Sequence, residues 1–184
     1  MDEYITIALP KGKLFDKSVR LLAKVGYSAE NVTEDSRKLV ISNEETKVRF
    51  IIAKTVDVPT YVEYGAADIG IIGKDVLLEQ DKDVVELLDL GFGRCRLMMA
   101  VPEAKRRAKL TDYAHLRPIV GLSEMIVDIV ETGRTLKENK LAEVDSIFTA
   151  TARLIANRAS FKLKFARLHK LVEDLRIVLN EEDK

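Results

Sequence analysis

The sequence predicts an α/β fold with a largely parallel sheet. Short apolar runs recur along the chain, and most of them lead into a stretch with helical spacing of apolar residues. Strands that alternate with helices are typical of α/β proteins, because each helix carries the chain back across the sheet. The chain has 184 residues, of which 47% are hydrophobic. That is enough for one large domain or for two small lobes, each with its own core.

The N-terminal half supplies most of this alternation. A strand is expected at 5–9, then a basic turn at 10–13 and a helix that ends at Gly26, a residue suited to a helix C-terminus. Asp57 and Pro59 suit the cap and first turn of a short helix. The other elements expected in this half are paired strands at 38–42 and 48–53, a buried strand at 69–72, a helix from 73, and strands at 84–88 and 95–101.

The C-terminal half continues the pattern with strands at 125–130 and 146–150, a helix at 134–139 and a long amphipathic helix at 160–180. The long helix is rich in Lys, Arg and Leu, and we expect its cations Lys162, Lys164 and Arg167 to face solvent. The stretch 103–118 has the weakest pattern.

Composition excludes several classes of function. Thirty basic residues balance thirty acidic ones, so the chain has no global field for nucleic acid, and any phosphate site must be local. Apolar runs are too short to span a membrane, and the N-terminus has no signal-peptide pattern, so we expect a cytoplasmic protein. Cys95 is the only cysteine, which excludes an internal disulfide, and His115 and His169 lie too far apart in sequence to suggest a zinc site.

The strongest local signal is the run 125–136, in which an apolar strand leads through Glu-Thr-Gly-Arg-Thr into a helix. Gly133 lets the backbone approach a ligand, and the free N–H groups of a helix start attract a phosphate. The residues that suit such a site are Asp128 and Glu131 for sugar hydroxyls or a magnesium ion, Thr132 or Thr135 as a cap, and Arg134 as a charged donor. A strand–turn–helix junction with purely structural capping explains the same residues equally well.

Cationic side chains also stand at the ends of several predicted strands. Lys11 and Lys13 follow the first strand, and Arg37, Lys38 and Lys54 lie before or after others. Together these cations indicate a polyphosphate pocket at the edge where α/β sheets bind ligands, although each one alone is more often a solvated residue. The turn with Gly73 and Asp75 matches neither the Walker pattern nor the dinucleotide fingerprint, and Asp75 is equally explained as a helix cap.

Cys95 and Arg96 open one of the predicted strands. Cys95 has no histidine nearby in sequence, which favours a core role over nucleophilic catalysis. Arg96 suits either a phosphate ligand or one half of an ion pair.

Six runs, in order along nearly the whole chain, resemble the ATP phosphoribosyltransferase family, whose members catalyse the first step of histidine biosynthesis. The runs are Ala8–Leu14, Asp35–Leu39, Asp57–Val76, Gly93–Leu97, Val127–Leu136 and Ala152–Ser160.

The resemblance implies a two-lobed fold like that of the type II periplasmic binding proteins, with mixed, largely parallel sheets and a cleft between the lobes. The first lobe would hold 1–94 with 152–184, and the second 95–151. The implied reaction transfers the phosphoribosyl group of phosphoribosyl pyrophosphate to N1 of the ATP adenine, with Mg²⁺ carried by substrate rather than by a cluster of side chains.

The resemblance also implies roles for residues. The run from Asp128 to Leu136 would bind the ribose and 5-phosphate. Arg37 and Lys54 would be the catalytic charges that meet the departing pyrophosphate. Nucleotide or pyrophosphate would contact Lys11, Gly73, Asp75 and Arg96.

The chain resembles the short form of the family, which lacks the C-terminal regulatory domain. That form works as a homodimer within a hetero-oligomer, together with a regulatory subunit resembling histidyl-tRNA synthetase. Two departures stand out. Glu124 replaces the usual Asp, and the family's strand–helix–strand stretch is missing between Arg117 and Pro118. Either the protein lacks this stretch or the sequence is joined across a gap. We favour a gap, because a true deletion would remove half of the second lobe's sheet; a normal Arg117–Pro118 peptide bond would contradict that.

Two rivals come from other classes of function. A solute-binding or effector-sensing module would share the fold, although the signal peptide of periplasmic binders and the helix-turn-helix of transcriptional sensors are absent from the sequence. An inactive interaction subunit would result if the missing stretch had removed the activity.

Overall fold

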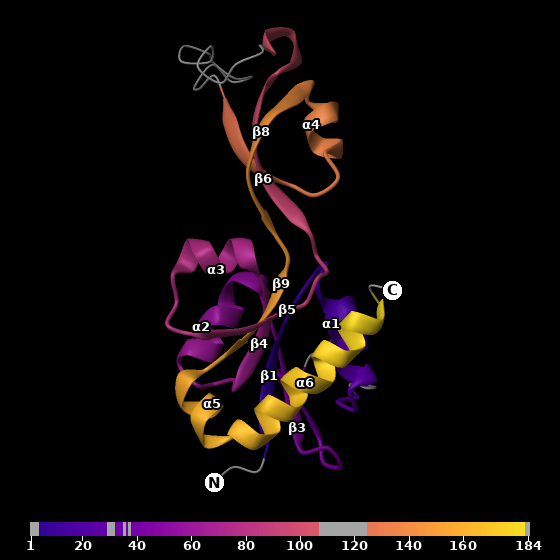
Figure 1. The fold of residues 1–184 in the computed structure, drawn as a ribbon, viewed down its shortest axis with the longest axis vertical. Coiled ribbons are helices and arrows are strands. Elements are labelled where there is room, and N and C mark those ends of the chain that lie inside the picture. The colour runs from indigo at the N-terminus through magenta and orange to yellow at the C-terminus, as the bar shows by residue number, and fades with distance from the viewer. Residues whose placement is uncertain (1–3, 29–31, 35, 37, 107–124, 183–184) are drawn as a thin grey trace. The chain divides into compact units, whose positions relative to one another are not determined.

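The structure of the chain is a computed structural model, which describes residues 4–28, 32–34, 36, 38–106 and 125–182 (Figure 1). The chain divides into two compact units. Unit 1 comprises Met1–Gly93 and Thr151–Lys184, and unit 2 comprises Arg94–Ala150. The backbone therefore passes from one unit to the other after Gly93 and returns after Ala150.

Unit 1 is built on a six-stranded sheet in the order β2-β3-β1-β4-β9-β5. Neighbouring strands β3, β1 and β4 run parallel, whereas β2 and β9 run antiparallel to their neighbours. The expected parallel character is thus confirmed in the centre of this sheet. The strands are β1 (Ile5–Pro10), β2 (Val40–Asn43), β3 (Val48–Ala53), β4 (Ile69–Gly73), β5 (Val85–Asp89) and β9 (Ala152–Ala156).

Helices cover both faces of this sheet. One face packs on α1 (Phe15–Lys24) and α6 (Phe165–Glu182), which bury Leu22 and Leu171 against the strands. The other face packs on α2 (Val58–Glu63) and α3 (Lys74–Gln80). The central strands are apolar on both sides because both sides are covered, as their near-continuous hydrophobic runs predict. A 3₁₀ turn, η1 (Thr55–Asp57), precedes α2, and α5 (Arg158–Leu163) precedes α6.

Unit 2 has a three-stranded antiparallel sheet, β7-β6-β8, within the residues that the structure describes. Its strands are β6 (Cys95–Pro102), β7 (Ile126–Val130) and β8 (Leu141–Ala150). The short helix α4 (Arg134–Glu138) buries Leu136 against Met98, Ala100 and Val130. The turn η2 (Glu103–Lys105) follows β6.

The structure differs from the sequence prediction in several details. The predicted helix at 160–180 is two helices, α5 and α6, with a break at Lys164. The solvent exposure expected for Lys164 and Arg167 is wrong: Lys164 pairs with Asp68 at 2.7 Å, and Arg167 donates to the Thr46 carbonyl at 3.0 Å. Asp57 does not cap α2 with its side chain, because the turn η1 already leads into that helix.

The described helices include none that is both long and apolar enough to cross a membrane.

Candidate functional site

Two of the predicted cations follow neighbouring parallel strands of unit 1. Lys11 comes after β1 and Lys54 after β3, and both side chains are exposed. The two turns are tied together, because the Lys11 N–H donates to the Ala53 carbonyl at 2.8 Å and the Thr55 hydroxyl donates to the Lys11 carbonyl at 3.0 Å. The carboxyl ends of β1 and β3 therefore carry both lysines on one edge of the sheet, where open α/β sheets bind ligands.

The third predicted turn lies after β4, which pairs with β1 in parallel. Gly73 precedes α3, and the Asp75 carboxylate folds back over it. A Cβ atom on Gly73 would lie 2.2 Å from Asp75 Oδ1. Glycine is therefore required here if the Asp75 carboxylate is to keep its place beside the turn.

In unit 2, the predicted phosphoribosyl-binding residues form the junction between β7 and α4. Gly133 precedes α4 with a φ of +72°, in the left-handed region that favours glycine. The Thr132 hydroxyl accepts a long hydrogen bond from the Arg134 N–H at 3.5 Å, whereas the Arg134 side chain pairs with Glu138 at 2.8 Å. Because α4 has only five residues, the loop backbone rather than a helix dipole would bind an anion here.

Behind this loop lies an ion pair across the sheet of unit 2. Arg96 on β6 donates to both carboxylate oxygens of Glu143 on β8, at 3.0 and 2.9 Å. A Cβ atom on Gly133 would lie 3.4 Å from Glu143 Oε1. Of the two interpretations open for Arg96, the structure shows the ion pair.

Gly133→Ala is expected to lower the free energy of unfolding by about 1 kcal/mol, because alanine in the left-handed region is strained. The new methyl group would also contact the Glu143 carboxylate. Urea unfolding measures the loss. Gly12→Ala is the control for backbone strain alone, because Gly12 also has a positive φ but no atom lies within 4 Å of its Cβ position. Equal stability of the Gly133 variant and the wild type would contradict the prediction.

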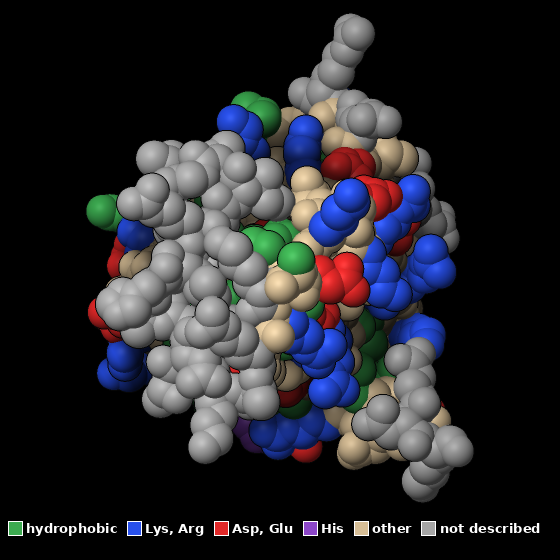
Figure 2. Space-filling view, turned by 90° about the horizontal axis from the view of Figure 1, so that it is seen from above, with side chains coloured by type: hydrophobic (Ala, Val, Ile, Leu, Met, Phe, Trp, Pro, Cys, Tyr) green, Lys and Arg blue, Asp and Glu red, His purple; other side chains and the backbone are tan. Residues whose placement is uncertain are grey.

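The remaining predicted residues lie at the surface or outside the described residues. Asp128 is exposed on β7 and accepts the Ile129 N–H at 2.8 Å, and Glu131 and Thr135 are exposed at the loop. Arg37 lies outside the described residues. On the face shown in Figure 2, basic and acidic side chains of the described residues are intermixed.

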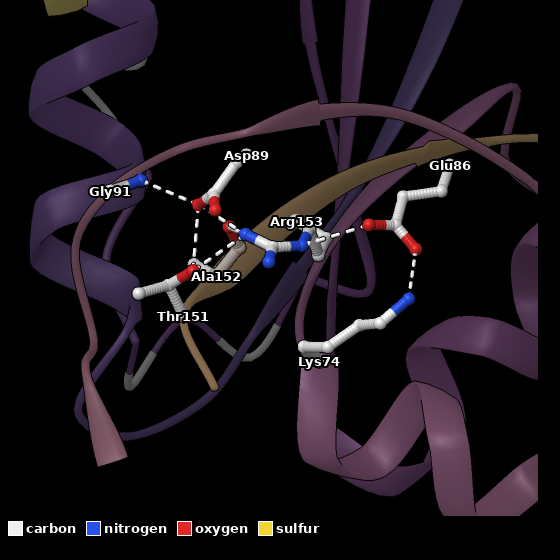
Figure 3. Close-up of polar contacts among 7 residues, drawn as sticks. All are labelled: Lys74, Glu86, Asp89, Gly91, Thr151, Ala152 and Arg153. Carbon is white, nitrogen blue, oxygen red and sulfur yellow. Dashed lines mark hydrogen bonds and ion pairs between the residues drawn. The ribbon is translucent and has the colours of Figure 1, made fainter. Parts of the chain in front are cut away.

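A polar network that the sequence did not indicate centres on Arg153 of β9 (Figure 3). The Arg153 side chain is 14% exposed, and its guanidinium lies between two carboxylates of β5. Its Nε is 2.8 Å from Glu86 Oε1, and its Nη1 contacts Asp89 Oδ1. Nη1 also donates to the Thr151 hydroxyl at 2.5 Å, and that hydroxyl donates to Asp89 at 2.7 Å.

The network reaches the turn after β4 through Lys74. The Lys74 ammonium pairs with Glu86, and the Lys74 N–H donates to the Thr151 carbonyl at 3.0 Å. The Gly91 N–H donates to Asp89 at 2.9 Å. Arg153 therefore lies at the centre of contacts that join β5, β9 and the Gly73–Asp75 turn.

Asp89 gives the network a dependence on pH. Burial opposes ionisation of its carboxyl, but the hydrogen bonds from Thr151 and Gly91 and the charge of Arg153 outweigh it and hold the pKa of Asp89 below its ordinary value. A lowered pKa stabilises the fold at pH values above the ordinary value, and this stabilisation is lost as the pH falls through the folded-state pKa.

Asp89→Asn is therefore expected to be less stable than the wild type at pH 7, with the difference shrinking below about pH 4. Urea unfolding at pH 7 and at pH 3 measures this. A difference that stays the same at both pH values would show that the charge of Asp89 does not contribute.

The family model for ATP phosphoribosyltransferase matches residues 54–117 and 114–177. A relative from Desulfitobacterium hafniense, named ATP phosphoribosyltransferase, is 45% identical. The alignment is 217 residues long, gaps included, and covers 97% of each chain. A solved complex from Thermotoga maritima, described as ATP phosphoribosyl transferase (HisG:HisZ), contains a chain with a TM-score of 0.75 and 27% identity, and the match covers 98% of this chain and all of that one.

The type II binding-protein fold is also matched at low identity. The aliphatic sulphonate binding protein SsuA of Escherichia coli has a TM-score of 0.52 at 10% identity, and the match covers all of this chain and 72% of that one. At this identity the likeness concerns the fold alone.

The comparisons also bear on the missing stretch. The region aligned with the D. hafniense relative is 217 residues long, whereas this chain has 184, so the relative carries residues that have no counterpart here. The family model matches in two parts that meet at residues 114–117. The Arg117–Pro118 junction lies outside the described residues, so the expectation of a sequence gap there stays a prediction.

The two matched parts of the family model span well over half of the chain, and the identity to the D. hafniense relative extends along almost all of it. The turns after β1 and β4 and the β7–α4 loop lie within the runs that carry the resemblance. The chain belongs to the ATP phosphoribosyltransferase family.

Proposed function

We propose that this protein transfers the phosphoribosyl group of phosphoribosyl pyrophosphate to N1 of the adenine of ATP and releases pyrophosphate, the first step of histidine biosynthesis. The observation that carries the proposal is the family membership, and the Glu-Thr-Gly-Arg-Thr loop with its left-handed Gly133 supports it. Such a loop exposes backbone N–H groups that suit a 5-phosphate.

The reaction requires positioning of the two substrates rather than a strong base. Adenine N1 carries a free lone pair, so it can attack C1 of the ribose as the bond to pyrophosphate breaks. Asp128 and Glu131 would accept hydrogen bonds from the ribose hydroxyls. Lys54, Lys11 and Arg37 would neutralise the charge that develops on the departing pyrophosphate, and Gly73 and Asp75 would line the nucleotide site.

We infer that the metal is Mg²⁺ held mainly by the substrate's phosphates. The described residues contain no group of three or more His, Cys, Asp or Glu side chains that could hold a metal ion. Mg²⁺ commonly binds through substrate phosphates and one or two carboxylates, and Asp128 and Glu131 are the carboxylates that suit it here. When bound, the ion would offset charge on the leaving group.

We further propose that the protein acts in the cytoplasm as a homodimer within a hetero-oligomer, with a regulatory subunit resembling histidyl-tRNA synthetase. Support comes from the solved T. maritima HisG:HisZ complex, whose matching chain is covered completely by this one. Histidine would then regulate the enzyme through the partner.

Pyrophosphate release from ATP, phosphoribosyl pyrophosphate and Mg²⁺, measured with and without the regulatory subunit, tests the proposal. We expect release that depends on both substrates and gives the phosphoribosyl-ATP product in equal amount. Calorimetric binding of the substrates without turnover in either condition would contradict the proposal and favour a binding module of the same fold. An absence of both binding and turnover would favour an inactive interaction subunit.

A further inference from the structure

The two passes of the backbone between the units lie side by side within unit 1. The outgoing pass follows β5 through Leu90 to Gly93, and the return pass enters β9 at Thr151. The Leu90 N–H donates to the Ala152 carbonyl at 2.9 Å, and the Ala152 N–H donates to the Phe92 carbonyl at 2.8 Å. The last residues of unit 1 on both passes are therefore joined as a two-stranded ribbon.

Arg153 adds the side-chain connection between these passes. Asp89 stands at the end of β5 and accepts both the Gly91 N–H of the outgoing pass and the Thr151 hydroxyl of the return pass. Arg153 contacts Asp89 and Thr151 together, and its own side chain is largely buried between them. A planar guanidinium can hold several acceptors in one fixed arrangement, which a lysine cannot do.

The same network extends to the turn proposed for nucleotide or pyrophosphate. Lys74 lies between Gly73 and Asp75, its N–H donates to the Thr151 carbonyl, and its ammonium pairs with Glu86, the second carboxylate beside Arg153. A displacement of Thr151 would therefore displace the Gly73–Asp75 turn, and a displacement of that turn would displace Thr151 at the start of the return pass.

We propose that Arg153 is a positioning residue for phosphoribosyl transfer. Acting through Thr151, Asp89 and Lys74, it holds the Gly73–Asp75 turn in fixed relation to both passes of the chain. This inference rests on the proposed function. Arg153 itself need not touch either substrate, so its loss should reduce turnover more than substrate binding.

Kinetics of three variants test this role. Arg153→Gln removes the charge, and Thr151→Val removes only the hydroxyl between Arg153 and Asp89 while keeping both charges and nearly the same volume. Arg158→Gln is the matched control, because Arg158 also forms an ion pair, with Asp83, but at the exposed start of α5. We expect kcat to fall about 10- to 100-fold in Arg153→Gln and about tenfold in Thr151→Val, as for a small misplacement of reacting groups, with KM for both substrates nearly unchanged.

Hydrogen exchange supplies a readout that does not depend on activity. The amides of Leu90 and Ala152, which join the two passes, should exchange about tenfold faster or more in Arg153→Gln and Thr151→Val, and at the wild-type rate in Arg158→Gln. If Arg153→Gln does not fold, Thr151→Val carries the test. Faster exchange in Arg153→Gln and Thr151→Val, combined with no turnover in the wild type, would contradict the proposed function. It would still support the connection between the two passes.

Wild-type kcat and exchange rates in Thr151→Val would overturn the inference. An equal loss of kcat in Arg153→Gln and Arg158→Gln would also overturn it, because the effect would then be a general loss of stability.

Discussion

Replacing Lys164 by methionine is expected to lower the free energy of unfolding by about 3 kcal/mol, at the lower end of the cost of breaking a buried ion pair. Asp68 is 6% exposed, and its Oδ2 accepts from the Lys164 ammonium at 2.7 Å and from the Thr6 N–H at 2.8 Å. Methionine fills the same space but leaves the Asp68 carboxylate buried without its cation. The Lys164 side chain is 22% exposed, which is why we take the lower end.

Thermal unfolding should show this loss as a fall in Tm of about 6–12 °C. Lys162→Met is the matched control, because Lys162 is also a lysine, lies two residues earlier in α5 and is exposed. The double variant Asp68→Asn with Lys164→Met should recover part of the loss, because a neutral amide oxygen can still accept from Thr6 without an unpaired charge. A Tm for Lys164→Met equal to that of Lys162→Met would show that the ion pair adds nothing.

Lys164 also shows what the helical periodicity of a segment does not predict. The apolar spacing from 160 to 180 predicted one helix with cations on its solvent side, and much of that range is indeed helical. The helix breaks at Lys164, whose partner Asp68 lies 96 residues away in sequence. Periodicity within a segment carries no information about such a partner.

Strands with simple apolar patterns were predicted well, and β3 was predicted with the bounds that the structure shows. The strand β9 was not predicted as a strand, although its run was recognised as part of the family resemblance. It is short, and an arginine interrupts its apolar residues. That arginine is Arg153, which is tolerated within the sheet because Glu86 and Asp89 lie beside it.

The candidate site likewise contains residues that could be predicted from the sequence and contacts that could not. Glycines and lysines that follow predicted strands could be read from the sequence, because the end of a parallel strand fixes the edge of the sheet on which they lie. The pairing of Arg96 with Glu143 and the network of Arg153 depend on contacts across strands, so their partners could not be predicted from sequence spacing. A charged residue inside an apolar strand is nevertheless a signal that partners exist, since buried charges are normally paired.

Lys54→Ala is expected to lower kcat on the order of 10²-fold with little change in stability. Lys54 follows β3, is exposed, and shares an edge of the sheet with Lys11. If it meets the departing pyrophosphate, its charge interacts most strongly when the bond to C1 breaks, and the loss of one such group typically costs 10²- to 10³-fold in kcat. We take the lower figure, because Lys11 and Arg37 would still offset part of the charge.

Three further measurements separate this role from a general effect of charge. Lys17→Ala removes the same charge from an exposed site on α1 and should leave kcat near the wild-type value. Lys54→Arg keeps a cation after β3 and should restore most of the turnover. Thermal unfolding should give the same Tm for the wild type and Lys54→Ala, because the side chain is exposed. A Lys54→Ala variant with wild-type kcat would exclude Lys54 from the reaction and leave the charge of the departing pyrophosphate to the other cations.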